Sequence, residues 1–264
     1  MRSAQFEAAS FFFFGQSHQL APFVHHTPFH SFSLSFPRAS SDFIMKSHSL
    51  VITLLAGLVS SSPLESRQSR YVGVSATEYT QDGCKPVIFF FARGSTEVGN
   101  LGSVVGQPAG RALKEALGED QVAVEGIDYA AAIRTNLLPG GADPAGVTAM
   151  RDLLVDAASK CPTSALLAGG YSQGAAVTHR AIEDLDPSVM DKIAGVVTFG
   201  DTQNTQDQGR IPNFPAEKLM IICNPGDAVC TGTLAILAPH FDYTKHVPEA
   251  VSFLTSKLTT AAGE

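Results

Sequence analysis

The segment GYSQG, residues 170–174, holds a serine between two glycines, a spacing that could present Ser172 as a nucleophile. With 24 serines and 23 glycines in 264 residues, roughly 0.2 matches to G-x-S-x-G are expected by chance, so the pattern alone is weak. Its context strengthens it, because a strand-like apolar stretch (165–170) leads into the serine and a helix-like stretch (174–182) leads out. A sharp strand-to-helix turn needs the room that flanking glycines give. The context therefore favours a nucleophile over an ordinary helix-capping serine.

A serine nucleophile needs a general base, and the chain after residue 70 offers three histidines: His179, His240 and His246. His179 lies seven residues after Ser172 on the same expected helix, about two turns away, which is too far to reach back. His240 and His246 lie near the C-terminus, where a site with the chain order Ser, Asp, His places its base. The residues alone leave the choice between these two open.

The acid that orients such a base should fall between Ser172 and the histidine. The candidates are Asp184, Asp186, Asp191, Asp201, Asp207 and Asp227. We favour Asp227, because CNPGDAVC (223–230) follows the last apolar stretch and a disulfide between its two cysteines would close a small, rigid loop. The alternative is a solvated turn aspartate after Pro-Gly.

Two backbone donors are expected to face the oxyanion of such a reaction. Gln173 follows the serine, so its N–H would lie at the start of the expected helix. The second donor should come from a loop after an early strand, and ARGSTE (92–97) is that loop, where Ser95 could offer its N–H and its hydroxyl. Ser95 could also be an ordinary turn serine.

The elements that would position these residues alternate along the chain. Strands are expected at 87–92, 121–127, 164–170, 193–200 and 218–223, and helices at 106–117, 143–160, 174–185 and 247–258. The second of these helices has a capping residue, Asp143, followed by a proline. Apolar strands separated by helices predict a single α/β domain, a three-layer sandwich around a central, mostly parallel five-stranded sheet.

Cysteine usage and the N-terminal residues indicate a secreted protein. From Met45 a short basic start, an apolar run (50–59) and small residues follow in the order of a signal peptide, which we place at 45–61. Residues 62–70 are expected to form a linker or pro-segment, and residues 1–44 are interpreted as a gene-model artefact or a disordered extension. The remaining residues, 71–264, hold four cysteines, an even count that favours disulfides. Three pairings are possible, and Cys223 with Cys230 closes the shortest loop.

Composition excludes several other classes of protein. The formal net charge is −7 and there is no basic run, so a nucleic-acid partner is not expected. No apolar stretch approaches the roughly 18 residues of a membrane span. No motif for a metal or another cofactor is present, and we expect a monomer.

Four motifs, FFFARGSTEVGNLG (89–102), GYSQG, CNPGDAVC and APHFDY (238–243), resemble in their order the cutinase family of small secreted serine esterases with the α/β-hydrolase fold. The resemblance covers about residues 80–258 and includes all four cysteines. It implies that Ser172 is the nucleophile, Asp227 the acid and His240 the base. It also implies that Ser95 and Gln173 are the oxyanion donors and that the disulfides are Cys84–Cys161 and Cys223–Cys230. Phe241 is bulkier than the residue expected there, and residues 1–44 have no counterpart in the family.

Apolar residues near the expected site suggest the substrate. Leu234, Ile236, Leu237 and Phe241 lie between the expected acid and base, and Leu137 and Leu138 are candidates for the opposite rim. The domain has little sequence to spare for a lid, so the rim should be open and suit an apolar ester. We expect hydrolysis of cutin-like polyesters and of small esters with short to medium acyl chains. These apolar residues could instead be ordinary core residues. The alternative functions are an acetylxylan-type esterase of the same fold and a catalytically dead secreted binding protein.

Overall fold

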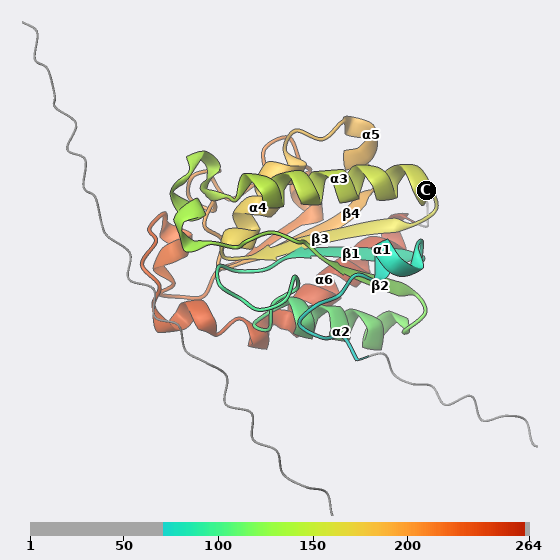
Figure 1. Cartoon of the computed structure of the whole chain (residues 1–264), viewed down its shortest axis with the longest axis horizontal. Helices are drawn as coiled ribbons and strands as arrows, with labels where there is room; N and C mark the ends of the chain where they lie inside the picture. The colour runs from blue at the N-terminus through green and yellow to red at the C-terminus, as the bar shows by residue number, and fades with distance from the viewer. Residues whose placement is uncertain (1–70, 262–264) are drawn as a thin grey trace, which may run out of the picture. The chain divides into compact units, whose positions relative to one another are not determined.

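The computed structural model describes residues 71–261, and side chains as far as residue 258. The expected signal peptide (45–61), the linker (62–70) and residues 1–44 lie outside the described residues. All described residues belong to one compact unit of the chain (Figure 1).

Five strands form one wholly parallel sheet in the order β2-β1-β3-β4-β5. They are β1 (Val87–Ala92), β2 (Val122–Gly126), β3 (Ala165–Tyr171), β4 (Ile193–Phe199) and β5 (Leu219–Ile222). Each corresponds to a strand expected from an apolar run. The predicted five-stranded α/β fold is therefore confirmed.

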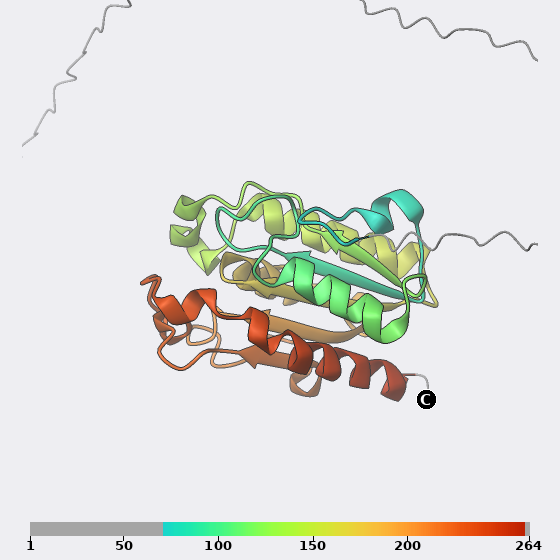
Figure 2. The ribbon, with the colours of Figure 1, turned by 90° about the horizontal axis from the view of Figure 1, so that it is seen from below.

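Helices cover both faces of the sheet. Helices α3 (Pro144–Lys160) and α4 (Gln173–Ile182) lie on one face, and α2 (Gly106–Leu117) and α6 (Val247–Ala261) lie on the other (Figures 1 and 2). Short helices α1 (Glu78–Asp82) and α5 (Pro187–Met190) were not expected from the sequence. The connections also contain six 3-10 turns: η1 (Ile133–Leu137), η2 (Pro139–Gly141), η3 (Ala216–Lys218), η4 (Ala228–Thr231), η5 (Ala238–Phe241) and η6 (Thr244–His246).

Strand β1 explains why its sequence, VIFFFA, is continuously apolar. Alternate side chains of a strand point to opposite faces of its sheet. Ile88 and Phe90 belong to the core beneath α3 and α4, whereas Phe89 and Phe91 belong to the core beneath α2 and α6. All four are fully buried, as a strand with helices on both sides requires.

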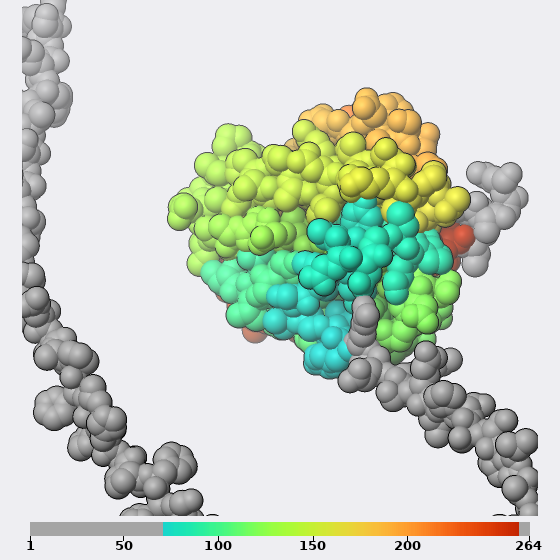
Figure 3. Space-filling model, turned by 45° about the vertical axis from the view of Figure 1, so that its right-hand side comes forward, coloured from blue at the N-terminus to red at the C-terminus, as the bar shows by residue number. Residues whose placement is uncertain are grey.

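Helix α3 begins where the sequence predicts. Asp143 accepts a hydrogen bond from the N–H of Ala145 (3.0 Å), and Pro144 occupies the first turn. The segment around α1 lies against α3 (Figure 3), where the hydroxyl of Tyr79 donates to Asp156 Oδ2 at 2.6 Å. This contact ties the start of the described chain to the outer layer.

A buried ion cluster joins α4 to the loop that follows β4. The ring of His179 has no exposed surface, and its Nε2 and Nδ1 lie 2.9 Å from Asp201 Oδ2 and 2.7 Å from Asp207 Oδ2. Burial lowers the pKa of His179, but the charges and hydrogen bonds of the two aspartates outweigh burial and raise it to about 9. Both ring nitrogens therefore donate, and Arg180 adds a second cation beside Asp207. The cluster fixes residues 201–207 on α4.

We expect the stability of the protein to fall in alkaline solution because of this histidine. Its pKa is raised from 6.5 to about 9, so its contribution is complete below pH 6.5 and is lost as the pH rises through 9. The contribution amounts to at most about 3 kcal/mol. Urea unfolding from pH 6 to pH 9.5 should show a steeper loss in the wild type than in His179→Gln, which should also be less stable at pH 6. Parallel stability curves for the two proteins would contradict this expectation.

Candidate active site

Ser172 occupies the sharp turn between β3 and α4. Its backbone has φ 56° and ψ −119°, a conformation that a non-glycine residue rarely adopts. A Cβ on Gly170 would lie 2.1 Å from the carbonyl oxygen of Gly174, and a Cβ on Gly174 would lie 2.0 Å from that of Ala92. The two glycines of GYSQG are thus required by close backbone approach, as the sequence pattern indicated.

The turn places the serine at the end of a chain of hydrogen-bonded side chains. His240 Nε2 lies 2.9 Å from Ser172 Oγ, and His240 Nδ1 lies 2.8 Å from Asp227 Oδ2. A carboxylate accepts, so Nδ1 carries the hydrogen, which leaves Nε2 free to accept from the serine hydroxyl. All three residues are buried. This geometry allows His240 to take a proton from Ser172 while Asp227 holds the imidazole.

Asp227 and His240 are held by contacts between their two loops. Asp227 caps η4 by accepting from the N–H of Val229 (3.1 Å), inside the loop closed by Cys223 and Cys230. Asn224 of the same loop donates through its amide to the carbonyl oxygens of Pro239 (2.8 Å) and Asp242 (3.0 Å), which flank His240. The acid and the base are therefore fixed relative to each other.

The other candidates for acid and base lie elsewhere. His246 contacts Asn224 Oδ1 (2.7 Å) and Glu249 Oε1 (2.5 Å), and His179 contacts its two aspartates, Asp201 and Asp207. Asp184, Asp186 and Asp191 are exposed on the surface. Only His240 and Asp227 come together at Ser172.

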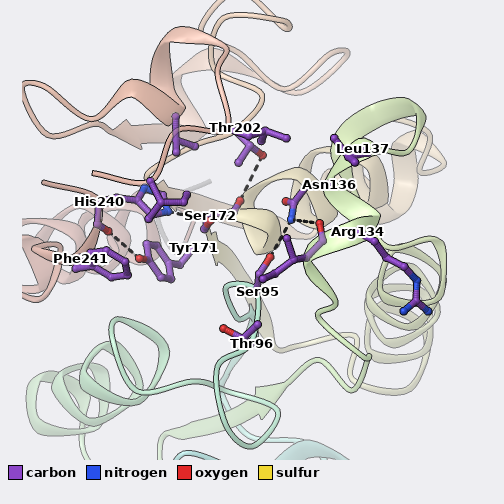
Figure 4. A pocket seen from close by; sticks show the side chains of 14 residues that line it. Ser95, Thr96, Arg134, Asn136, Leu137, Tyr171, Ser172, Thr202, His240 and Phe241 are labelled. Atoms are coloured by element: carbon purple, nitrogen blue, oxygen red, sulfur yellow. Dashed lines mark hydrogen bonds between the residues drawn. The ribbon is translucent and has the colours of Figure 1, made fainter. Parts of the chain in front are cut away.

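Of the two expected oxyanion donors, Ser95 lines the same cavity as Ser172, and Gln173 follows Ser172 in the chain. Gln173 is the first residue of α4, where backbone N–H groups have no partner within the helix. Ser95 lies on the loop after β1, and the amide of Asn136 donates to its Oγ at 3.0 Å, which leaves the Ser95 hydroxyl hydrogen free to turn toward a ligand (Figure 4). Glu97 shapes this loop by accepting from the N–H groups of Gly94, Ser103 and Val104.

The side chain of Gln173 has a second role that the sequence did not reveal. Its Nε2 donates to the carbonyl of Ala132 and to Thr135 Oγ1, both at 2.9 Å. These contacts hold η1, and with it Leu137, at the edge of the site. The rim is therefore anchored to the residue after the serine.

Ser172 opens into a cavity of about 370 Å³ with mainly apolar walls. Its lining comprises Ser95, Thr96, Ile133, Arg134, Asn136, Leu137, Tyr171, Ser172, Thr202, Val229, Leu234, Ile236, His240 and Phe241. At the mouth, Leu234 is 48% exposed and Leu137 is 78% exposed. In Figure 4, His240 and Leu137 lie on opposite sides of Ser172, and the guanidinium of Arg134 extends away from it.

Four of the six apolar residues expected at the rim line this cavity: Leu137, Leu234, Ile236 and Phe241. Leu138 does not, because η1 ends at Leu137 and the chain then runs extended into Pro139. Leu237 also lies outside the lining. Ile133, Tyr171 and Val229 also line the cavity and were not expected from the sequence, although Tyr171 directly precedes Ser172.

Both cysteine pairs that the resemblance implies are present as disulfides. Cys84–Cys161 joins residues 77 apart, and Cys223–Cys230 joins residues seven apart. The first lies between the start of β1 and the end of α3, and the second encloses Asp227. The two bridges therefore lie in different parts of the molecule: Cys161 precedes β3, whose other end leads into Ser172, whereas the short bridge encloses the loop of the acid.

We expect removal of the two disulfides to have opposite main effects. The double variant Cys84→Ser/Cys161→Ser should lose more stability, because chain entropy assigns about 4–5 kcal/mol to the long loop and about 2–3 kcal/mol to the short one. Cys223→Ser/Cys230→Ser should lose more activity, because it loosens the loop that carries Asp227. Urea unfolding and ester hydrolysis at a temperature where both variants are folded would test this. Equal loss of activity in the two variants would refute the role given to the short loop.

Neither a metal-binding cluster nor a membrane-spanning helix is found in residues 71–261. No group of three or more histidine, cysteine or acidic side chains in this part of the chain could hold a metal ion. Among the same residues, no helix has the length and apolar character that a membrane span requires.

A parallel sheet with a strained serine between a strand and a helix, followed along the chain by an aspartate and a histidine, defines the α/β-hydrolase class. The model of the family described as Cutinase matches residues 83–258. The chain is 47% identical over 211 residues to cutinase CUT2 of Pyricularia oryzae, covering 80% of this chain and 98% of that protein. The chain belongs to the cutinase family.

Solved structures agree with this fold. The cutinase of Trichoderma reesei, solved with a phosphonate inhibitor, has a TM-score of 0.63 and 32% identity, covering 71% of this chain and 81% of that one. An acetylxylan esterase has a TM-score of 0.54 and 21% identity, covering 66% of this chain and 99% of that one. The second likeness concerns the fold alone.

Proposed function

We propose that this protein is a cutinase-type serine esterase that hydrolyses cutin-like polyesters and short to medium acyl esters through an acyl-enzyme on Ser172. The observation that carries the proposal is the unbroken hydrogen-bond chain from Ser172 through His240 to Asp227, at the floor of an apolar cavity. Relatives named as cutinases at more than 40% identity support the substrate class.

The chemistry follows from the positions of the atoms. Ser172 Oγ attacks the ester carbonyl carbon while His240 Nε2 takes the hydroxyl proton. The carbonyl oxygen becomes an anion, which in this mechanism the N–H groups of Gln173 and Ser95 and the Ser95 hydroxyl stabilise. The C–O bond breaks, the proton passes from His240 to the leaving alcohol, and the acyl group stays on Ser172. Water then attacks the acyl carbon while His240 takes its proton, the bond from the acyl carbon to Ser172 Oγ breaks, and the proton passes back to Ser172 as the carboxylic acid leaves.

The cavity mouth supports an apolar substrate. Ile133, Leu137, Leu234, Ile236 and Phe241 surround it, and each is about half exposed or more. A ring of exposed apolar side chains beside a nucleophile suits a substrate that is itself an apolar surface. Because these rim side chains are exposed among the described residues, the site should not need a lipid–water interface for activation.

Rates on three substrates test this assignment. We expect hydrolysis of p-nitrophenyl butyrate and of an insoluble aliphatic polyester, with no jump in rate when the soluble ester exceeds its solubility. Acetylated xylan should be a poor substrate. A clear preference for acetylated xylan with the polyester untouched would assign the protein to the carbohydrate esterases instead, and no turnover of any ester would favour a binding protein.

We also propose that the protein is secreted as a monomer, with a signal peptide at 45–61, a linker or pro-segment at 62–70 and a single catalytic domain at 71–264. Translation would begin at Met45, with residues 1–44 as a gene-model artefact. The two disulfides are consistent with an extracellular protein. The N-terminal sequence and mass of the protein recovered from culture medium would test the boundaries.

A further inference from the structure

We propose that Tyr243 is a positioning residue of the site. Its phenol hydroxyl donates a hydrogen bond to the carboxylate of Asp227 and so reduces the negative charge that this carboxylate presents to His240. Through this contact Tyr243 sets the pH at which His240 becomes available as a base. The inference rests on the proposed function and adds a fourth side chain to the three already described.

The direction of the hydrogen bond follows from the neighbours of the hydroxyl. The backbone N–H of Asn224 donates to Tyr243 Oη at 2.9 Å, and Tyr243 Oη lies 2.6 Å from Asp227 Oδ2. An N–H group can only donate, so the phenol hydrogen is left for an acceptor. The other nearby atom is Cys230 Sγ at 3.8 Å, a much weaker acceptor in a disulfide. The phenol therefore donates to the carboxylate.

The phenol remains protonated and shielded from solvent. Tyr243 has no exposed surface, and burial, followed by the contact with Asp227, raises the pKa of Tyr243 far above its ordinary value. The side chain of Asp227 is also fully buried, so bulk water does not compete for the carboxylate. The hydrogen bond is therefore present throughout the pH range in which an esterase works.

Tyrosine and histidine share one carboxylate oxygen. Asp227 Oδ2 accepts from both Tyr243 Oη (2.6 Å) and His240 Nδ1 (2.8 Å), whereas Oδ1 accepts from the N–H of Val229. Two donors on one oxygen divide its charge between them. Removing the phenol hydroxyl would leave more negative charge facing His240, which would stabilise the protonated imidazole. His240 would then be able to act as a base only at a higher pH.

The ring and the hydroxyl of Tyr243 can be separated experimentally. The ring packs against Tyr171, Phe199, His240 and His246, at centroid distances of 5.9, 6.2, 6.2 and 6.0 Å. Tyr243→Phe keeps this packing and deletes only the hydroxyl. It also leaves the N–H of Asn224 without its acceptor, so lower stability alone would not be evidence for the proposal.

The test is the pH dependence of kcat/KM on p-nitrophenyl butyrate. In Tyr243→Phe we expect kcat to fall roughly tenfold with KM little changed, since one charge-assisted hydrogen bond is lost. The acid limb of the profile should move about half to one pH unit higher. The far-downfield NMR signal of the His240 Nδ1 hydrogen should also shift.

Two control variants remove comparable hydroxyls. Tyr79→Phe deletes another phenol that lies 2.6 Å from an aspartate, Asp156, away from the site, and should leave the profile unchanged. Tyr171→Phe deletes the hydroxyl that donates to the carbonyl of His240 (2.7 Å) without touching Asp227, so the acid limb should stay in place even if the rate falls.

An acid limb that stays in place in Tyr243→Phe would overturn the proposal, whatever happens to kcat or stability. If that variant does not fold, 3-fluorotyrosine at position 243 provides the test instead. Its more acidic phenol should move the acid limb to lower pH, and an unmoved acid limb would overturn the proposal. Activity retained by Ser172→Ala would instead refute the proposed function. An inactive Ser172→Ala beside an unmoved profile in Tyr243→Phe would refute this inference alone.

Discussion

Ser172→Ala is expected to fold normally and to hydrolyse p-nitrophenyl butyrate about 10⁴- to 10⁶-fold more slowly than the wild type. The hydroxyl that His240 contacts at 2.9 Å is the only nucleophile at the cavity floor in the proposed mechanism. The variant should fold, because alanine tolerates a φ of 56° no worse than the serine it replaces.

Ser164→Ala is a suitable control for this variant. Ser164 is a second buried serine, next to the other end of β3, and its hydroxyl donates to the carbonyl of Lys85 at 2.6 Å. Its loss should reduce stability and leave turnover unchanged. Turnover by Ser172→Ala close to that of the wild type, with a normal circular dichroism spectrum, would refute the mechanism.

The second large effect concerns the two C-terminal histidines. His240→Gln should lose about 10⁴-fold or more in kcat/KM, whereas His246→Gln should keep most of its activity. His246 contacts Asn224 rather than the serine, and a glutamine amide can still donate to the same Asn224 oxygen. The double variant Ser172→Ala/His240→Gln should be no slower than Ser172→Ala, because the two residues act as a unit.

The opposite pattern of activities would contradict the assignment of His240 as the base. An active His240→Gln with an inactive His246→Gln would transfer the role of base to His246. Additive losses in the double variant would indicate that Ser172 and His240 act separately, contrary to the proposed chemistry.

The sheet could be predicted because its strands carry the signal in their own residues. VIFFFA is apolar throughout because both faces of the strand are buried. The start of α3 is marked by the capping residue Asp143 and by Pro144. The 3-10 turns carry no such signal, because tertiary contacts shape them. Turn η1, for example, is held by the side chain of Gln173, more than 35 residues away in the chain.

The candidate site was predictable in outline for a similar reason. The glycines around Ser172 are dictated by local backbone crowding, and Asp227 stands in a loop marked by two cysteines. The choice of His240 over His246 needed the family resemblance, since the contacts of Asn224 that separate them are not visible in the sequence.

Two buried polar groups could not have been found from the sequence. His179 could be excluded as the base, but its partners Asp201 and Asp207 lie 22 and 28 residues further along and meet it only through the fold. Tyr243 has the pattern of an ordinary core aromatic residue. Its hydrogen bond to Asp227 depends on the relative placement of two loops.

Covalent labelling with an organophosphate, followed by reduction, trypsin digestion and mass spectrometry, tests the role of Ser172 most directly. We expect one equivalent of label on the tryptic peptide 161–180, located by fragmentation at Ser172 rather than Ser164, with no label on Ser172→Ala and slow labelling of His240→Gln. A folded wild-type protein that takes up no label, or a Ser172→Ala variant labelled as fast as the wild type, would contradict this role.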